Sequence, residues 1–445
     1  MERLITLLSF KIIIPVLIPV LVIAGCSQFL PAETPTPAVV IPTLPQPTNL
    51  PTATTNPTPV VIQGTVRIWH SWNELEVPVL DQIIKEFSAQ YPNVYFDVLY
   101  IPIDNLRSRF EMAAMEGNAP DILLGPADWA PGLYEAGFIS ELTGIVDAQA
   151  LEMLNQPALN AAIINDKLVG LPYSIRGTIL FRNRNLIPDS AVTFDQLVYN
   201  ANAAAKGDQI GAMLDRSLLY SGANLEGIGG QMMDADGLPA FNNEKGLEWI
   251  ELLERYKEAG PTDYFTEQDV DLFKQGKVGI IVEGNWRMQE FSEAIGAESL
   301  SIDRWPEYNG FNLAGYVLPE NMYLNSNTSG DRLRAAQNFM RHFVSTDTQT
   351  RIAEMGQVPS ARDIILTDPI TGTLMSKAMT AMSNGVAYPV SPEWEAYQLP
   401  LDLALRSIFS GSSTAKDALQ SAQDEVMKAI LEIKPAPAAT LTPMP

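Results

Sequence analysis

The spacing of apolar positions along the chain predicts a sheet of parallel strands covered by helices. Three short apolar runs are typical of buried strands, at residues 65–69, 94–101 and 121–125. Between them, apolar residues recur at helical spacing over 80–87 and again over about 105–116. Strands that alternate with helices in this way indicate an α/β fold with helices on the faces of the sheet.

The same pattern restarts near Leu171, which indicates a second α/β unit. Residues 178–183 and 278–283 read as strands, and residues 245–259 read as a helix. Thr193 and Gln196 have the spacing of a capping box at the start of another helix. The stretch from 62 to about 433 is longer than one core usually serves, so we expect two lobes.

The N-terminal pattern is that of a secretory signal. Basic residues precede an apolar run from Ile12 to Ala24, which is shorter than the ~20 residues of a membrane-spanning helix. Gly25 and then Cys26, the only cysteine of the 445 residues, follow the run. Residues 23–26 resemble the lipobox of bacterial lipoproteins, which implies a signal peptide over 1–25 and a lipid anchor on Cys26. The alternative is an uncleaved membrane anchor with an incidental thiol.

Composition separates a folded part from two flanking segments. Residues 26–61 are rich in Pro and Thr and predict an extended linker, and residues 434–445 predict a disordered tail. The formal net charge of −23 argues against nucleic-acid binding, because such a surface repels phosphate. The chain holds none of the common hydrolase, metalloprotease or nucleotide-binding motifs. We therefore expect no enzyme activity, no metal site and no cofactor.

Several stretches, in this order, resemble the extracellular solute-binding proteins of ABC transporters, in the carbohydrate-binding family that includes maltose-binding protein. They include "VRIWHSW", "APDILLG", "KLVGLPYS", "FKQGKVGIIVEGNW" and "GQVPSARD". The resemblance implies a two-lobed periplasmic-binding-protein-like fold of type II, with a ligand cleft between lobes joined by a hinge. It implies lobe 1 at 62–174 and 306–358, and lobe 2 at 178–303 and 361–433.

Aromatic and polar residues near the expected strand ends are the candidates for a sugar site, because sugars pack on aromatic rings and hydrogen-bond to charged and amide groups. Each of them has a structural alternative, namely core packing for the aromatic residues and a helix cap, a turn or an ion pair for the polar ones. The candidates of this kind are Trp72, Trp129, Arg176, Asn285 and Trp286, and the resemblance implies Asp128, Trp394 and Tyr397 in addition.

Arg176 departs from the family pattern, since maltose-binding protein carries an acid in the corresponding stretch after "LP". A guanidinium suits a carboxylate or phosphate better than a pair of neutral hydroxyls. This residue therefore opens the possibility of an acidic sugar or a phosphodiester, beside the alternative of an ion pair across the hinge.

These features together predict a receptor on the extracellular or periplasmic side of the cell membrane, held by its lipid anchor. It would bind a carbohydrate as a monomer and deliver it to the permease subunits of an ABC transporter. A receptor that senses ligand without transport, and a surface enzyme acting on glycosides, are the alternatives. The sequence does not reveal the identity, size or charge of the ligand.

Overall fold

The computed structural model describes residues 61–74, 76–263 and 267–433. The expected signal peptide, Cys26, all of the linker except residue 61, and the tail lie outside the described residues, so those predictions stay untested.

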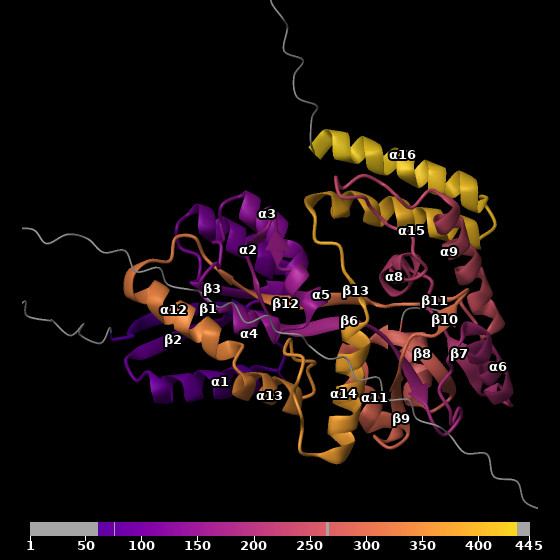
Figure 1. Ribbon diagram of the computed structural model, residues 1–445, viewed down its shortest axis with the longest axis horizontal. Coiled ribbons are helices and arrows are strands. Elements are labelled where there is room, and N and C mark those ends of the chain that lie inside the picture. Colours follow the sequence, from indigo (N-terminus) through magenta and orange to yellow (C-terminus); the bar gives the residue numbers. More distant parts are fainter. Residues whose placement is uncertain (1–60, 75, 264–266, 434–445) are drawn as a thin grey trace, which may run out of the picture. The chain divides into compact units, whose positions relative to one another are not determined.

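The main sheet of the described residues has nine strands and carries both halves of the fold (Figure 1). Its order is β2-β1-β3-β12-β6-β8-β7, with β13 paired to β12 and β9 paired to β6. The strands are β1 (Gly64–His70), β2 (Val94–Tyr100), β3 (Ile122–Pro126), β6 (Leu171–Asn183), β7 (Ile210–Met213), β8 (Val278–Gly284), β9 (Leu300–Asp303), β12 (Tyr316–Leu324) and β13 (Val386–Ala387). Two small hairpins add β4 (Ile163–Ile164) with β5 (Lys167–Leu168), and β10 (Glu307–Tyr308) with β11 (Phe311–Asn312).

Helices cover both faces of the sheet, in each half of the fold. The α-helices are α1 (Val77–Gln90), α2 (Ile103–Met115), α3 (Ala130–Glu135), α4 (Ala148–Glu152), α5 (Gln156–Asn160), α6 (Phe194–Ala204), α7 (Leu218–Ser221), α8 (Ala223–Gly227), α9 (Glu244–Arg255), α10 (Gln268–Lys274), α11 (Met288–Ile295), α12 (Gly330–Phe343), α13 (Thr346–Glu354), α14 (Pro369–Ser383), α15 (Glu395–Phe409) and α16 (Ala415–Ile433). Short 3₁₀ turns are η1 (Ala127–Trp129), η2 (Tyr256–Glu258), η3 (Asn285–Arg287) and η4 (Pro392–Trp394).

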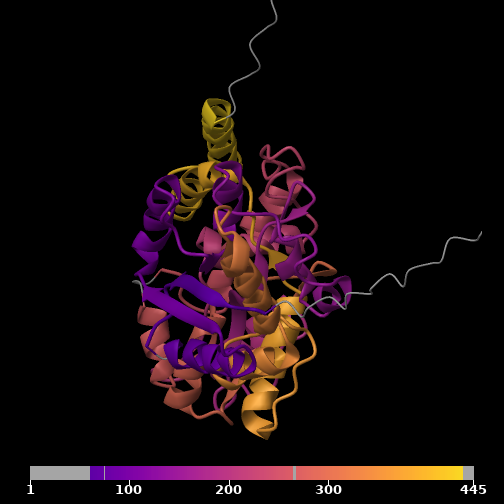
Figure 2. The same ribbon diagram turned by 90° about the vertical axis from the view of Figure 1, so that its left-hand side faces the viewer.

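We call lobe 1 the part built on β1, β2 and β3, which pair in parallel as the sequence predicts. Side chains of β3 alternate between its two faces. Ile122 and Leu124 pack in the core with α1 and α12, whereas Leu123 packs in the core with α2 and α3. Figure 2 shows these strands with α1 on one side and α2 on the other. A strand buried on both faces must be apolar throughout, which explains its continuous apolar run.

We call lobe 2 the part built on β7, β8 and β9, and it has the same double packing. On β8, Ile280 and Val282 face the core with α6, α9 and α15, whereas Ile281 faces the core with α10, α11 and α14. The predicted cap of α6 is present, since Thr193 Oγ1 accepts a hydrogen bond from the backbone N–H of Gln196 at 3.2 Å.

Two long antiparallel strands, β6 and β12, run from one lobe to the other. Their register pairs Met322 with Leu171 in lobe 1 and Val317 with Gly177 at the start of lobe 2. The sequence predicted only the part of β6 from 178 onward. Tyr308 and Leu313 pack in the core of lobe 2, although the resemblance implied that residues 306–358 belong to lobe 1. The chain therefore returns to lobe 1 along β12, later than position 306.

Candidate functional site

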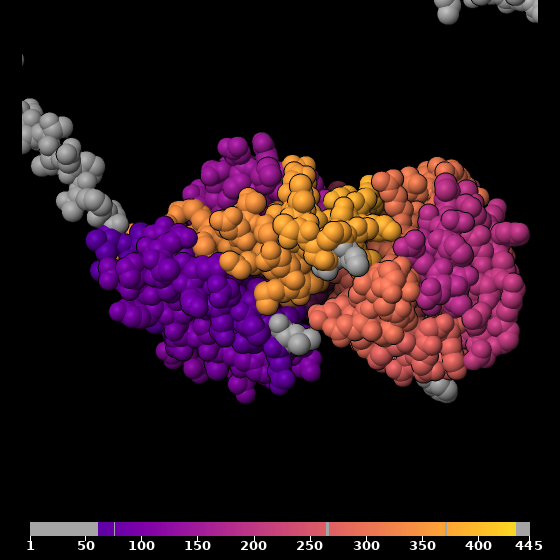
Figure 3. Space-filling view, turned by 90° about the horizontal axis from the view of Figure 1, so that it is seen from below, coloured from indigo at the N-terminus to yellow at the C-terminus, as the bar shows by residue number. Residues whose placement is uncertain are grey.

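A cavity of about 280 Å³ lies between the two lobes, beside the crossing strand β6. Lobe 1 contributes the start of α1, lobe 2 contributes η3 and the start of α11, and the segment after α13 supplies another wall. Figure 3 shows the indigo surface of lobe 1 and the coral surface of lobe 2 facing each other across a hollow. The lining residues on which the site depends are Asn73, Glu76, Arg176, Asn285, Trp286 and Gln357.

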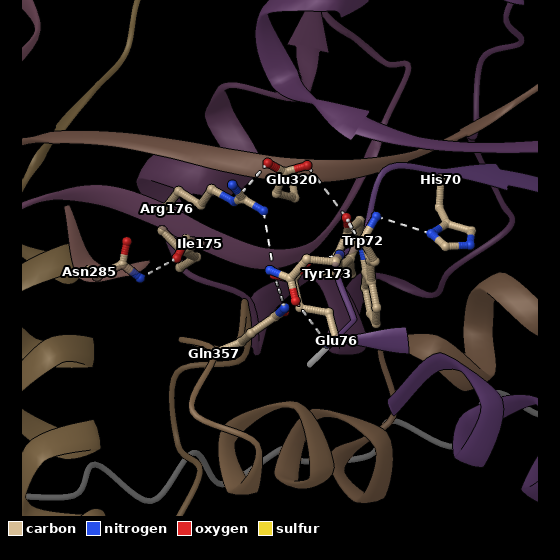
Figure 4. Close-up of polar contacts among 10 residues, drawn as sticks. His70, Trp72, Glu76, Tyr173, Ile175, Arg176, Asn285, Glu320 and Gln357 are labelled. Atoms are coloured by element: carbon tan, nitrogen blue, oxygen red, sulfur yellow. Dashed lines mark hydrogen bonds and ion pairs between the residues drawn. The ribbon is translucent and has the colours of Figure 1, made fainter. Parts of the chain in front are cut away.

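Glu76, at the N-terminal end of α1, connects three segments of the site. Its Oε1 accepts a hydrogen bond of 2.7 Å from Gln357 Nε2, and its Oε2 accepts one of 2.8 Å from the backbone N–H of Asn73. Arg176 Nη2 lies 3.6 Å from Glu76 Oε1. One carboxylate thus ties the start of α1 to β6 and to the segment after α13 (Figure 4).

Arg176, predicted as a site residue, faces the cavity but is also ion-paired. Its Nε lies 3.0 Å from Oε1 of Glu320, which is on the neighbouring strand β12. The Arg176 side chain is 40% exposed, whereas that of Glu320 is only 8% exposed. Burial raises the pKa of Glu320, although the charge of Arg176 acts in the opposite direction. The predicted alternative, an ion pair at the hinge, therefore describes Arg176, and its position still leaves it on the cavity wall.

Trp72 lies inside lobe 1, where it is linked through Tyr173 to Glu320, and it does not reach the cavity. It is 3% exposed, and its Nε1 donates a 2.9 Å hydrogen bond to the hydroxyl of Tyr173. That hydroxyl in turn donates to Glu320 Oε2 at 3.5 Å. Trp72 also packs against Phe343, so core packing, the structural alternative, describes its surroundings.

Asn285 uses both ends of its amide to hold the backbone on either side of Arg176. Its Nδ2 donates to the carbonyl oxygen of Ile175 at 2.8 Å, and its Oδ1 accepts from the N–H of Gly177 at 2.9 Å. The side chain is buried and continues the pairing of β8 with β6 by one residue. Asn285 is therefore better suited to positioning Arg176 than to donating to a ligand.

Trp286 is the exposed aromatic residue of the cavity wall. It follows Asn285 in η3, lines the cavity and remains 44% exposed. Its ring lies over Gly284, where an added Cβ would come within 2.1 Å of ring atoms. Only glycine at 284 leaves room for this ring position, in which Trp286 lines the cavity and stays partly exposed.

Asp128 and Trp129 lie in η1, on the lobe 1 side. Trp129 is 8% exposed and packs in the core with α2 and α3. Burial raises the pKa of Asp128, although the charge of Arg107 acts in the opposite direction. Arg107 Nη1 also lies 3.4 Å from Oε1 of Glu395 on α15, which gives a second polar link between the lobes. The N-cap residue of α3 is Trp129 and not Asp128, so the alternative of a helix cap does not describe Asp128.

Trp394 and Tyr397 pack in the core of lobe 2 and are away from the cavity wall. They are 2% and 0% exposed, and their rings stack with centroids 5.4 Å apart. The hydroxyl of Tyr397 donates to the carbonyl oxygen of Gly237 at 2.7 Å. Tyr388, which packs edge-on against Trp394, is partly exposed, so it is the member of this group that a ligand could contact.

Sequence reasoning missed Glu76, Glu320 and Gln357. Glu76 is one of two acids just after the first strand, and nothing in its local pattern separates it from Glu74. Glu320 is recognisable only as an acid inside a mostly apolar strand, and a buried acid requires a partner. Gln357 lies in "GQVPSARD", a stretch that carried the family resemblance without a named role.

Other kinds of site find no support within the ranges given above. No group of three or more His, Cys, Asp or Glu side chains there could hold a metal ion. The helices of the same ranges are all too short or too polar to cross a bilayer.

Comparison with known sequences matches one family over much of the chain. The family model described as bacterial extracellular solute-binding protein matches residues 82–382. The galactooligosaccharide-binding protein of Bacillus subtilis is 25% identical over 72% of this chain and 79% of its own length. A maltooligosaccharide ABC transporter solute-binding lipoprotein of Streptococcus pneumoniae is 24% identical over 70% of this chain and 75% of its own length.

Comparison with solved structures matches the fold. An extracellular solute-binding protein from Staphylococcus aureus, solved with maltose, has a TM-score of 0.74 at 21% identity. It aligns over 83% of this chain and 99% of its own. The cyclic α-maltosyl-1,6-maltose binding protein from Arthrobacter globiformis has a TM-score of 0.72 at 20% identity, over 83% of this chain and all of its own. The predicted two-lobed α/β fold is therefore confirmed.

Proposed function

Because this chain belongs to the family of bacterial extracellular solute-binding proteins, we propose that it binds a carbohydrate between its lobes and delivers it to the permease of an ABC transporter. The observation that carries the proposal is the cavity itself. It combines the partly exposed ring of Trp286 with the amides of Asn73 and Gln357 and the charges of Glu76 and Arg176. Aromatic faces with a few fixed polar groups are what sugar recognition requires.

The names of relatives support the same ligand class. These names give galactooligosaccharides, maltooligosaccharides and maltose as the sugars, and each describes a binding protein. The proposed lobes are those expected from the sequence, 62–174 with 306–358 and 178–303 with 361–433, except that the return to lobe 1 runs along β12. Closure over the ligand would turn the lobes about β6, β12 and the segment near Pro359, which is bridged to Ser174.

We further propose that Trp286, Arg176, Asp128 and Tyr388 contact or face the ligand, while Asn285, Trp72, Trp129, Trp394 and Tyr397 position or support them. Cys26 would carry a lipid anchor that keeps a monomeric receptor at the cell surface, with the linker as spacer. The lipoprotein named among the relatives supports the anchor.

A ligand screen tests the proposal. Purified residues 61–433 are mixed with malto- and galactooligosaccharides, and with amino acids as the comparison class. A ligand at 100 times its Kd should stabilise the protein by about 2.7 kcal/mol, seen as a saturable rise in Tm. Chromatography of the recovered sugar should find it unchanged. Saturable stabilisation by amino acids alone would refute a carbohydrate receptor, and time-dependent sugar products would refute a binding protein.

A further inference from the structure

We propose that the cavity selects an uncharged ligand rich in hydroxyls and excludes its anionic counterpart, because the guanidinium of Arg176 is already neutralised by two carboxylates. The inference deepens the proposed function and rests on it. Of the two roles considered for Arg176, binding an acidic ligand and forming an ion pair at the hinge, it favours the ion pair, since an acidic sugar would require this cation to be available.

Arg176 and its two acidic partners, Glu320 and Glu76, together carry no net positive charge. Glu320 Oε1 lies 3.0 Å from its Nε, and Glu76 Oε1 lies 3.6 Å from its Nη2. With both acids ionised, the three side chains carry a net charge of −1. If the buried Glu320 holds its proton, the net charge is zero. In neither state does the group offer the positive charge that an incoming carboxylate or phosphate needs.

The rest of the cavity wall offers no replacement cation. Among its lining residues in the part of the chain that the structure describes, Arg176 is the only basic one. An anion would also approach Glu76, which lies on the same wall, and like charges at close range repel. The formal net charge of −23 adds a long-range repulsion of the same sign.

Arg176 nevertheless keeps hydrogen-bonding capacity for neutral oxygen atoms. A guanidinium has five N–H donors, more than the two contacts that join Nε to Glu320 and Nη2 to Glu76 require. Its side chain is 40% exposed, and the amides of Asn73, Gln289 and Gln357 line the same wall. Such groups can donate to and accept from sugar hydroxyls, and Trp286 offers its ring to a sugar face.

Matched ligand pairs test the inference by calorimetry on the purified protein in about 0.15 M salt. The pairs are maltotriose, galactotriose and cellotriose, each with the trimer in which every 6-hydroxymethyl group is oxidised to a carboxylate. We expect at least one neutral trimer to bind and its acidic partner to bind at least 30-fold more weakly. The comparison needs no variant, so it does not depend on the folding of a mutant.

The variant Glu76→Gln then tests the cause. It removes one of the two compensating charges, so the acidic trimer should gain at least fivefold relative to the neutral one. Glu254→Gln, at an exposed position on α9, changes the net charge equally and should leave the ratio as in the wild type. Melting curves confirm that each variant is folded.

Each outcome decides the inference. An acidic trimer that binds the wild type as tightly as its neutral partner, or more tightly, overturns the selectivity. An unchanged ratio in folded Glu76→Gln overturns the assigned cause. If no trimer of either charge binds, the proposed function fails and the inference falls with it, which separates that failure from the other two.

Discussion

Trp286 and Trp394 give a paired test of where the ligand binds. Trp286 is 44% exposed and lines the cavity, whereas Trp394 is 2% exposed and stacks on Tyr397. Replacing Trp286 with alanine should mainly weaken ligand binding. Replacing Trp394 with alanine should mainly reduce the free energy of unfolding.

The exposed area of Trp286 sets the affinity that Trp286→Ala should lose. A tryptophan offers up to about 250 Å², so a side chain 44% exposed leaves roughly 110 Å² to cover. If the ligand covers about half, the area term is roughly 1.4 kcal/mol, and ring stacking adds about 0.5 to 1.5 kcal/mol. The sum of roughly 2 to 3 kcal/mol corresponds to a Kd about 30 to 150 times higher for Trp286→Ala.

Stability should separate the two variants. Trp394→Ala removes a fully packed ring and should cost roughly 3 to 5 kcal/mol of stability. Its Kd, measured at temperatures where the protein stays folded, should rise less than that of Trp286→Ala, because Trp394 acts on the ligand only through Tyr388. Trp286→Ala should cost clearly less, since its ring is only partly packed, and Trp286→Phe should recover part of the affinity. Urea unfolding gives the stability and calorimetry gives the Kd, with the bound oligosaccharide of the screen as ligand. A folded Trp286→Ala protein with unaltered affinity and a large loss of stability would refute the site.

Three further changes have defined outcomes. Cys26→Ser should move the protein from the membrane to the soluble fraction, and an unmodified thiol in soluble wild-type protein would contradict the anchor. Asn285→Ala leaves the Gly177 N–H and the Ile175 carbonyl without their partner, and should cost about 1 to 3 kcal/mol for each buried group in urea unfolding, whereas an unchanged midpoint would show that water replaces the amide. Burial raises the pKa of Glu226 from 4.5 to about 7, so the folded protein keeps a proton that the unfolded chain releases and stability falls as pH rises between these values. Glu226→Gln should remove a decline of up to roughly 3 kcal/mol, and a wild-type pH profile identical to that of the variant would refute the shift.

Much of the fold follows from local pattern. The first three strands lie within one residue of their predicted bounds, and α1 contains the predicted helical stretch 80–87 and extends three residues beyond it at each end. A strand buried on both faces and a helix buried on one face impose different apolar periods, which is why both were predicted. Order and spacing of short motifs then identified the family, and with it the two-lobed fold. Trp286 was selected as an aromatic residue that follows a predicted strand, and Arg176 was selected because it departs from the family pattern.

The tertiary structure decided which of the candidates face the ligand space. Trp72, Trp286 and Trp394 all follow or border regular elements, and nothing in the local sequence tells a ring packed inward from a ring left exposed. The charge of the site was equally hidden, since Glu76 and Glu320 meet Arg176 from positions 100 and 144 residues away in sequence. The ion pair of Arg176 with Glu320 depends on how β6 and β12 pair, because their register places Glu320 opposite Ser174, two residues from Arg176. The contact with Glu76 depends on where α1 lies relative to β6.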